Sequence, residues 1–343
     1  MRFTILGAGA IGGITGAHLI GSGHEVTWVD PVTEHLDAIR EHGLTVEGAS
    51  NVVARPARAI APGELQPPLG TVLCAVKTLH TRTALAPVAP ILGRDEAVLS
   101  MQNGLAYYDV MEAVGRERTL VACFNFGGHY KGPGRVVHGT TGGFHIGEID
   151  GRLTPRVAAL RDALSAVQEC EASTNVLGCL WSKMAMASVF FATALVDADV
   201  KDILARERYH ALMADLVAET VAASRAMGVQ VYELHGFDPA SVSRDDRSPE
   251  AVRRALDAIA GSFNPLQQRT GIWIDLAVRK RKTEAESQLG RLVQEASAHG
   301  VAMPLNRAVL DLILEMEAGR RTFAWENLDE VERRGRAVSG GRG

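Results

Sequence analysis

Residues 2–30 read RFTILGAGAIGGITGAHLIGSGHEVTWVD, with the pattern of a strand, a glycine-rich turn, a helix and a second strand. Residues 2–6 are short and apolar, which is typical of a buried parallel strand. A helical pattern covers residues 11–20 and stops at the sequence GSGH. Residues 25–29 form the second apolar segment, and Asp30 follows it directly. We therefore predict a β-α-β unit in this stretch.

The glycines after the first predicted strand have the G-x-G-x-x-G spacing of dinucleotide-binding sites. Gly7 permits a tight turn, Gly9 lets a pyrophosphate approach the backbone, and Gly12 lets the helix pack closely on the strand. The free N–H groups of the first helical turn, which contains Ala10 and Ile11, would face the phosphates. The alternative is a β-α-β unit whose glycines only make turns and bind no ligand. The flanking strand, helix and acid favour the dinucleotide site.

Asp30 favours NAD(H) over NADP(H) as the cofactor. A carboxylate at the end of the second strand accepts hydrogen bonds from ribose hydroxyls and repels a 2′-phosphate. Pro31 follows where an NADP-dependent enzyme would profit from an arginine, and Arg40 lies further along, where it is equally a surface charge. FAD is a lesser alternative, because its binding fingerprint is similar.

Two polar residues lie at the ends of later strand-like segments. Residues 71–77 end in Lys77, and residues 97–105 contain Gln-Asn-Gly with Asn103 in its centre. Ligands of doubly wound sheets lie outside the carboxyl ends of the strands, so both residues are candidates for the cofactor side of the site. Alternatively, Lys77 is a solvated strand end and Asn103 a turn residue, because Asn-Gly is itself a turn signal. Residues 132–151 predict short antiparallel strands with glycine turns.

From about Thr174 the pattern changes to long helices. The polar residues 235–249 predict a loop. We predict a dinucleotide-binding domain at 1–172, a helical substrate and dimerisation domain at 173–330 and a disordered tail at 331–343. The predicted helices span about residues 177–195, 199–227, 249–263, 283–300 and 306–317.

Composition excludes several classes of function. The formal net charge of −4 gives no electrostatic case for binding nucleic acid or an anionic membrane. No apolar run reaches about 18 uncharged residues, and the glycine motif starts too early for a secretory signal. The four cysteines lie in apolar surroundings without C-x-x-C spacing, which predicts buried free thiols in a reducing cytoplasm. His129, His138 and His145 fit no common zinc spacing, so we expect no metal.

Lys183 is the only charged residue in the apolar run 179–195. An unpaired ammonium is costly to bury, so this residue needs a partner or an exposed face. Ala187 and Phe190 share its helix face and offer no polar group. Lys183 is therefore either snorkelling from a core helix or a functional group whose partner comes from elsewhere. Similarly, the basic run 279–282 is either a solvated helix end or a source of cations for a substrate carboxylate.

Taken together, these residues resemble the ketopantoate reductase (2-dehydropantoate 2-reductase) family over nearly the whole chain. The resemblance implies a Rossmann-type doubly wound α/β domain followed by an all-helical C-terminal domain, with an active-site cleft between them. The matching pieces are GAGAIGG at the start, VKT at 76–78, QNGL at 102–105, IGEIDG at 146–151, LWSK at 180–183, RKRKTE at 279–284 and GVAMPLNRAVLDLI near the end.

The same resemblance implies roles for four residues. Carried over position by position, Lys183 is the general acid and Lys77 the cofactor-side lysine. Asn103 corresponds to the asparagine of Gln-Asn-Gly, and Glu284 to the glutamate of Thr-Glu. The resemblance thus predicts an NAD(P)H-dependent reductase of a 2-oxo acid, most simply a homodimer in the cytoplasm.

Three departures from the family pattern change the expected substrate and cofactor. The family's asparagines four and eight residues after the lysine are Ala187 and Phe191 here. GIWIDLAV at 271–278 replaces the usual Ser-Met-Leu-Gln-Asp, and Asp30-Pro31 replaces the usual NADP-binding arginine. We therefore expect NAD(H) and a 2-oxo or 2-hydroxy acid with an apolar or bulkier side chain rather than ketopantoate. The alternatives are an opine-type or imine-reducing dehydrogenase and a non-catalytic NAD(P)-sensing regulator.

Overall fold

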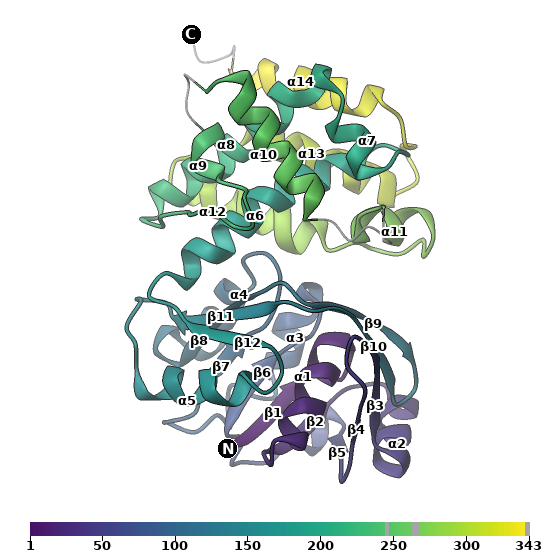
Figure 1. Ribbon diagram of the computed structural model, residues 1–343, viewed down its shortest axis with the longest axis vertical. Helices are drawn as coiled ribbons and strands as arrows, with labels where there is room; N and C mark the ends of the chain where they lie inside the picture. Colours follow the sequence, from purple (N-terminus) through teal and green to yellow (C-terminus); the bar gives the residue numbers. More distant parts are fainter. Residues whose placement is uncertain (244–246, 263–267, 340–343) are drawn as a thin grey trace. The chain divides into compact units, whose positions relative to one another are not determined.

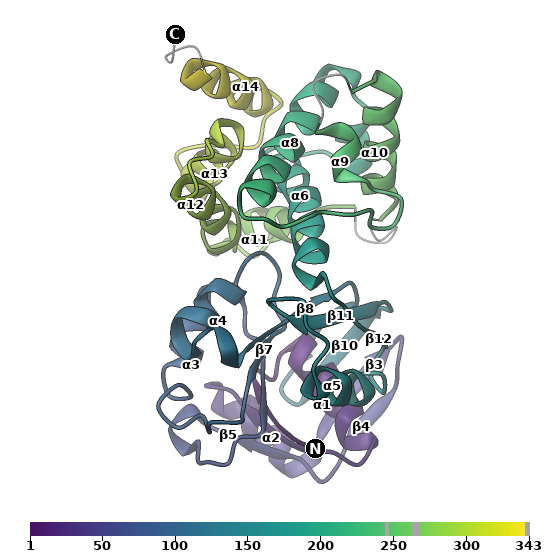
Figure 2. The ribbon, with the colours of Figure 1, turned by 90° about the vertical axis from the view of Figure 1, so that its left-hand side faces the viewer.

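The computed structural model describes residues 1–243, 247–262 and 268–339. The chain forms two compact units, Met1–Val176 and Leu177–Gly343, which are shown in Figures 1 and 2. The predicted domain boundary, between residues 172 and 173, lies shortly before this division. The first unit is α/β and the second is helical, which confirms the predicted fold class.

An eight-stranded sheet in the order β12-β11-β8-β7-β6-β1-β2-β5 forms the centre of the first unit (Figure 1). From β5 to β8 all neighbouring strands are parallel, whereas β11 is antiparallel to β8. The strand order reverses at β1, which pairs with β2 on one side and β6 on the other. The strands are β1 (Arg2–Leu6), β2 (Glu25–Val29), β5 (Arg58–Ile60), β6 (Thr71–Cys74), β7 (Val98–Ser100), β8 (Thr119–Phe124), β11 (Gly143–Glu148) and β12 (Glu169–Ala172).

Helices cover both faces of this sheet. Side chains alternate along β1, so Phe3 and Ile5 belong to one apolar cluster and Leu6 to the other. Helices α1 and α5 contribute to the first cluster, and α3 and α4 to the second. The helices of this unit are α1 (Ala10–Gly21), α2 (Thr33–His42), α3 (Thr81–Leu85), α4 (Tyr107–Val114) and α5 (Pro155–Leu164), with short 3-10 turns η1 (Pro62–Glu64), η2 (Thr78–His80) and η3 (Arg116–Arg118).

A second, four-stranded sheet packs on α1. Its order is β4-β3-β10-β9, with bounds Val52–Ala54, Leu44–Gly48, Arg135–Thr140 and Gly127–Gly132. A Cβ atom on Gly128 would lie 2.8 Å from Cδ1 of Ile14, so the two elements are in close contact. Here the prediction for residues 132–151 is partly wrong, because β10 pairs with β3 and β9 while β11 joins the large sheet.

A partly buried polar network ties the small sheet to α1. Gly142 N–H donates to Oε1 of Gln168, so the amide nitrogen of Gln168 faces Nε2 of His138 at 3.4 Å. His138 Nδ1 and Ser50 Oγ are 2.8 Å apart, and Ser50 Oγ lies 2.9 Å from Nε2 of His18. With Gln168 as donor, neutral His138 donates to Ser50, which donates in turn to His18. Burial lowers the pKa of both histidines.

Among its described residues, the second unit contains helices and one isolated β-bridge between Leu234 and Phe237, but no strand. The predicted helix 199–227 is split into α7, a 3-10 turn and α8, and the predicted loop 235–249 contains the short α9. The elements are α6 (Val176–Thr193), α7 (Val200–Leu204), η4 (Glu207–Tyr209), α8 (His210–Ala226), α9 (Pro239–Val242), α10 (Pro249–Gly261), α11 (Gly271–Ala277), the π-helical turn η5 (Glu286–Gly290), α12 (Arg291–Ala298), α13 (Pro304–Glu317) and α14 (Glu326–Ser339). Phe263, the end of a predicted helix, lies outside the described residues.

The prediction of a disordered tail at 331–343 is wrong as far as residue 339, where α14 ends. The helix is amphipathic: Leu328 and Val331 are fully buried, while Arg334 pairs with Glu315 of α13 at 3.0 Å. Residues 340–343 lie outside the described part of the chain. The sequence did not indicate this apolar face, because arginines and glycines make up most of residues 331–343.

Helix α6 is long and apolar enough to cross a membrane by length and composition alone. However, 78 % of it is buried within the structure, as in the core helix of a globular unit. It is the one such helix among the described residues.

Candidate functional site

The glycine loop lies at the point where the strand order reverses. Gly7 follows β1 with a φ of +92°, a conformation that side chains disfavour, and its N–H donates to Val29 O at 2.8 Å. A Cβ atom at Gly7 would lie 3.0 Å from Cγ1 of Val76, and one at Gly12 would lie 2.0 Å from the Gly7 oxygen. These two glycines are therefore required by the turn and by the close approach of α1.

Gly9 differs from its two neighbours in the motif. It precedes α1, and a Cβ atom there would meet no other atom within 4 Å. Ala10 and Ile11 begin the helix, and its first turn carries no acidic residue. The open space beside Gly9 and the N–H groups of this turn fit a pyrophosphate, because an anion is favoured at a helix N-terminus. The residues present thus fit a dinucleotide.

Asp30 is held beside this loop by two backbone hydrogen bonds. Its Oδ2 accepts from Ala8 N–H and its Oδ1 from Val32 N–H, both at 3.0 Å. Each carboxylate oxygen retains a second acceptor position for a ribose hydroxyl. Arg40, in contrast, donates to the Ala59 oxygen at 2.7 Å and pairs with acidic neighbours on the surface.

The loops that carry Lys77 and Asn103 are joined by a residue that sequence reasoning missed. Gln102 Nε2 donates to Val76 O and to Thr81 Oγ1, both at 2.8 Å. These bonds connect the loop after β7 to the loop after β6, so Lys77 and Asn103 are carried by one cross-linked pair of loops. Gln102 is 5 % exposed, and among the described residues its Oε1 has no partner. Its place in the Gln-Asn-Gly motif was the available signal.

Lys183 lies on the partly exposed side of the otherwise buried α6. Ala187 and Phe190 are also partly exposed, as the helical spacing predicts, and we call these three residues the lysine face. Phe191, in contrast, is only 3 % exposed. Trp181 and Met184 are buried core residues at 0 % and 1 % exposure. Of the two positions that replace the family's asparagines, only Ala187 belongs to the lysine face.

Glu284 lies two residues before the π-helical turn Glu286–Gly290, a feature that often marks functional sites. The preceding Thr283 fixes this segment, because its N–H and hydroxyl both donate to Oε1 of Glu317, at 2.8 and 2.6 Å. Thr283 Oγ1 in turn accepts from Ala285 N–H at 3.1 Å. Lys183 and Glu284 belong to separate elements of the helical unit, and their pairing stays a prediction.

The basic run 279–282 has a structural role in the described part of the chain. Arg279 and Arg281 both donate to Oδ1 of Asp275, which is 3 % exposed. Lys282 pairs with Glu286 at 3.3 Å. A buried carboxylate needs such partners, so Arg279 and Arg281 neutralise Asp275 in this structure.

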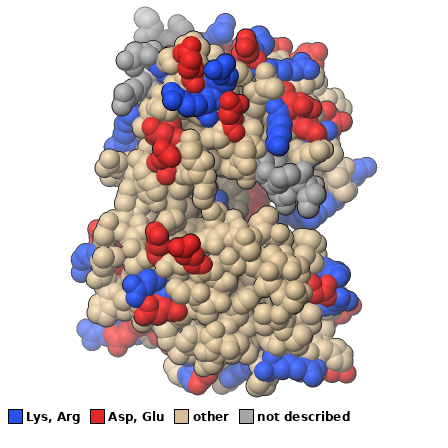
Figure 3. Space-filling view, viewed as in Figure 1, with Lys and Arg blue, Asp and Glu red and all other residues tan. Residues whose placement is uncertain are grey.

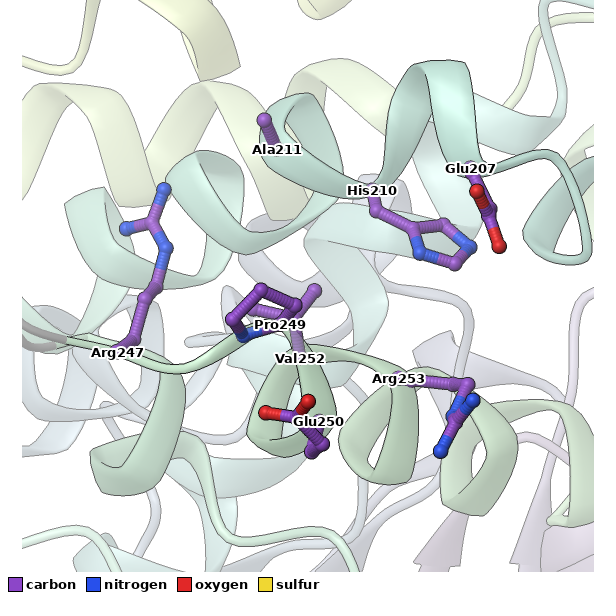
Figure 4. Close-up of a pocket in the computed structure, with 8 residues that line it drawn as sticks. All are labelled: Glu207, His210, Ala211, Arg247, Pro249, Glu250, Val252 and Arg253. Atoms are coloured by element: carbon purple, nitrogen blue, oxygen red, sulfur yellow. The ribbon is translucent and has the colours of Figure 1, made fainter.

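A cavity of about 440 Å³ lies in the helical unit, and none of the predicted site residues lines it (Figure 4). The cavity is lined by Glu207, His210, Ala211, Arg247, Pro249, Glu250, Val252 and Arg253. Its walls carry both charge signs, and Arg247 is already paired with Asp215.

On the face seen in Figure 3, basic and acidic side chains are interspersed without a broad basic area.

All four cysteines are buried and free, as predicted. Burial raises the pKa of Cys74 and of Cys170 to about 12, so neither thiol ionises at neutral pH. Within the described residues, no three histidine, cysteine or acidic side chains are grouped as they would be around a metal ion.

Comparison with known proteins gives one consistent result. The family model for ketopantoate reductase PanE/ApbA matches residues 3–151, and the model for its C-terminal part matches residues 175–317. The 2-dehydropantoate 2-reductase of Halobacterium salinarum is 31 % identical over 322 residues, which cover 91 % of this chain and 98 % of that protein.

Solved structures agree with this result. A PanE/ApbA family ketopantoate reductase from Ralstonia eutropha JMP134 has a TM-score of 0.77 at 27 % identity, covering 93 % of this chain and 99 % of that one. A D-mandelate dehydrogenase solved with NADH and anilino(oxo)acetate has a TM-score of 0.78 at 21 % identity, with the same coverage. The second similarity shows a shared fold.

Proposed function

The chain belongs to the ketopantoate reductase family, and we propose that it reduces a 2-oxo acid to the 2-hydroxy acid with NADH. As a member of this family, it is an NAD(P)-dependent oxidoreductase that acts on a CH–OH group. The observation that carries the proposal is the glycine loop at the strand reversal. Gly9 there leaves open space in front of the first helical turn.

We assign the cofactor to the residues of this loop and its neighbours. Gly7, Gly9, Ala10, Ile11 and Gly12 would hold the pyrophosphate through backbone N–H groups. Asp30 would accept the ribose hydroxyls, which favours NAD(H) over NADP(H). Lys77 and Asn103 would contact the cofactor from the loops that Gln102 joins.

Three side chains would serve the reaction itself. When bound, the nicotinamide supplies a hydride to the carbonyl carbon. Lys183 Nζ donates the proton to the carbonyl oxygen as the C–O double bond becomes a hydroxyl. Glu284 holds the ammonium by pairing with it, and Asn103 donates a hydrogen bond to the substrate.

The substrate we propose has an apolar or bulky side chain and is not ketopantoate. Ala187 offers a methyl group on the lysine face, at a position where the family has an asparagine that holds the substrate. A pocket without polar groups gives no hydrogen bond to the hydroxyl of ketopantoate, whereas it accepts a larger apolar group. The dehydrogenase of similar fold named above acts on mandelate, an aromatic 2-hydroxy acid, and this guides the choice of test compounds.

A cofactor-consumption screen tests these assignments. NADH and NADPH are each combined with pyruvate, 2-oxobutyrate, 2-oxoisovalerate, phenylglyoxylate and ketopantoate, with and without ammonia or an amine. We expect NADH with a bulky apolar 2-oxo acid to give the highest kcat/KM and the amine to add nothing. Ala187→Asn should raise the kcat/KM for ketopantoate relative to phenylglyoxylate. Ketopantoate as the best substrate of the unchanged protein would refute the substrate assignment.

We further propose that the protein is a cytoplasmic homodimer. Four buried free thiols suit a reducing compartment. Light scattering after size-exclusion chromatography would give twice the chain mass of 36.7 kDa for a dimer. Cell fractionation with the native protein tests the compartment.

A further inference from the structure

Tyr130 is an exposed aromatic residue on the small sheet, beside the proposed adenosine end of the cofactor site. It lies on β9 and is 49 % exposed, whereas most large apolar side chains of this unit are buried. Its ring meets the edge of His35, with the two ring centroids 5.2 Å apart and an angle of 77° between the planes.

His35 connects Tyr130 to the glycine loop. It is 2 % exposed, and its Nδ1 accepts from Gly134 N–H at 2.9 Å. The proton of the neutral ring is therefore on Nε2, which donates to Ala8 O at 2.9 Å. The imidazole thus links α2, the β9–β10 turn and the glycine loop.

Ala8 carries this connection on to Asp30. The carbonyl of Ala8 accepts from His35, and the N–H of Ala8 donates to Oδ2 of Asp30 at 3.0 Å. Tyr130 is consequently joined to Asp30 through two intervening residues, each held by backbone hydrogen bonds. Burial and then the negative charges of Glu34 and Asp30 raise the pKa of Tyr130, so the phenol keeps its proton and remains a donor.

We propose that Tyr130 is a second residue that recognises the adenosine ribose, its hydroxyl donating to the 2′-oxygen. In this arrangement Asp30 accepts the 2′-hydroxyl proton while Tyr130 donates to the same oxygen. Glu34, an exposed residue in the first turn of α2, adds negative charge on this side. A 2′-phosphate would then face two carboxylates, which disfavours NADPH. This inference rests on the proposed binding of NAD(H).

Binding measurements without substrate test the inference directly. The dissociation constants of NADH and of 2′-deoxy-NADH are measured by fluorescence for the unchanged protein, Tyr130→Phe and His129→Ala. His129 is the matched control, because it is an exposed neighbour whose side chain leaves the strand on the opposite face. Thermal unfolding of each variant verifies that it is folded.

We expect Tyr130→Phe to weaken NADH binding about 3- to 10-fold, the range of one neutral hydrogen bond. The deoxy cofactor should bind the unchanged protein and Tyr130→Phe equally, and His129→Ala should bind NADH as the unchanged protein does. Equal NADH binding by Tyr130→Phe, or an equal loss with both cofactors, would overturn the role of the hydroxyl. If the unchanged protein bound no NADH at all, the proposed function itself would fail.

Discussion

The glycine loop and the lysine face differ in the groups that they present: backbone N–H groups in the first and a side chain in the second. In the proposed function the loop would bind its ligand through backbone N–H groups, so its geometry depends on glycines at defined positions. In the proposed function the lysine face would act through one long side chain, that of Lys183 on the mostly buried α6, and Glu284, its proposed partner, is far from it in the sequence. Backbone sites of this kind are therefore visible in a short sequence motif, whereas side-chain sites require the tertiary structure.

The largest expected effect is a loss of NADH binding when either of two loop glycines, Gly12 or Gly9, is replaced by alanine. Gly12→Ala should abolish NADH binding and lower the Tm, because the new Cβ would lie 2.0 Å from the Gly7 oxygen. Gly9→Ala should leave the unfolding free energy within about 0.5 kcal/mol, since no atom lies within 4 Å. Its NADH affinity should nevertheless fall at least about 10-fold, as the methyl group takes the space of the phosphate.

Calorimetry and NADH titration of both variants make this comparison. Unimpaired NADH binding by Gly9→Ala would contradict the assignment of the open space to the pyrophosphate. A destabilised Gly9→Ala variant would show instead that the space is needed for folding.

Substitution of Lys183 on the lysine face should lower the catalytic rate and leave NADH binding and stability nearly unchanged. Lys183→Met should lower kcat/KM by about 10²–10⁴-fold, the usual contribution of a general acid. The dissociation constant of NADH and the Tm should change little, since the methionine retains the apolar part of the side chain. Lys201→Met, at an exposed lysine of α7, is the control and should leave kcat/KM unchanged. Steady-state kinetics that showed equal rates for the two variants would remove Lys183 from the mechanism.

Substitution of Asp30, beside the glycine loop, should have an effect of intermediate size on NADH binding. Asp30→Ala should weaken NADH binding about 10-fold or more, because hydrogen bonds to a carboxylate are lost, while NADPH binding changes little. Asp37→Ala serves as the matched control, since Asp37 is an exposed acid of α2 that pairs with Arg40 at 3.1 Å. The two cofactors are titrated in parallel. A selective loss of NADPH binding in Asp30→Ala would contradict the assignment of Asp30 to the ribose of NADH.

The smallest effect concerns the histidine network that holds the small sheet on α1. Burial lowers the pKa of His18 and His138 below the ordinary value of 6.5, so the folded state binds fewer protons than the unfolded state below that pH. Their contribution to stability is therefore complete above pH 6.5 and is lost as the pH falls through the lowered values. We expect the Tm to be lower at pH 5.5 than at pH 7.5, by about a few degrees at most.

The variant His18→Gln/His138→Gln provides the comparison for this prediction. Its Tm should be lower at pH 7.5 but should depend less on pH over the same interval. Thermal unfolding that showed the same pH dependence in both proteins would assign the effect to other groups.

The first β-α-β unit could be predicted closely from sequence, because its signals are local. The glycine spacing and Asp30 lie within one short stretch, and the strands β1 and β2 have the predicted bounds. The small sheet could not be predicted, since its central pairing joins Thr45 to Arg135, two residues far apart in the chain. His35 and Tyr130 depend on that pairing and were missed with it.

The helical unit shows the same limit in another form. Lys183 stood out in sequence because a charge in an apolar run is unusual, and Ala187 followed from helical spacing. The buried position of Phe191 and the binding of Arg279 and Arg281 to Asp275 depend on packing between helices. Composition even misled for α14, whose apolar face is formed by a few residues among many charged ones.

The contact between Gly16 and Trp28 limits how this protein can diverge. A Cβ atom on Gly16 would lie 2.5 Å from the indole of Trp28, and that indole donates its N–H to the Gly12 oxygen at 2.9 Å. Position 16 can therefore accept a larger residue only if position 28 becomes smaller, and such a change would also free the carbonyl of a motif glycine. We expect the two positions to vary together among descendants of this sequence, so that a library mutating both at once would recover folded variants that single substitutions miss.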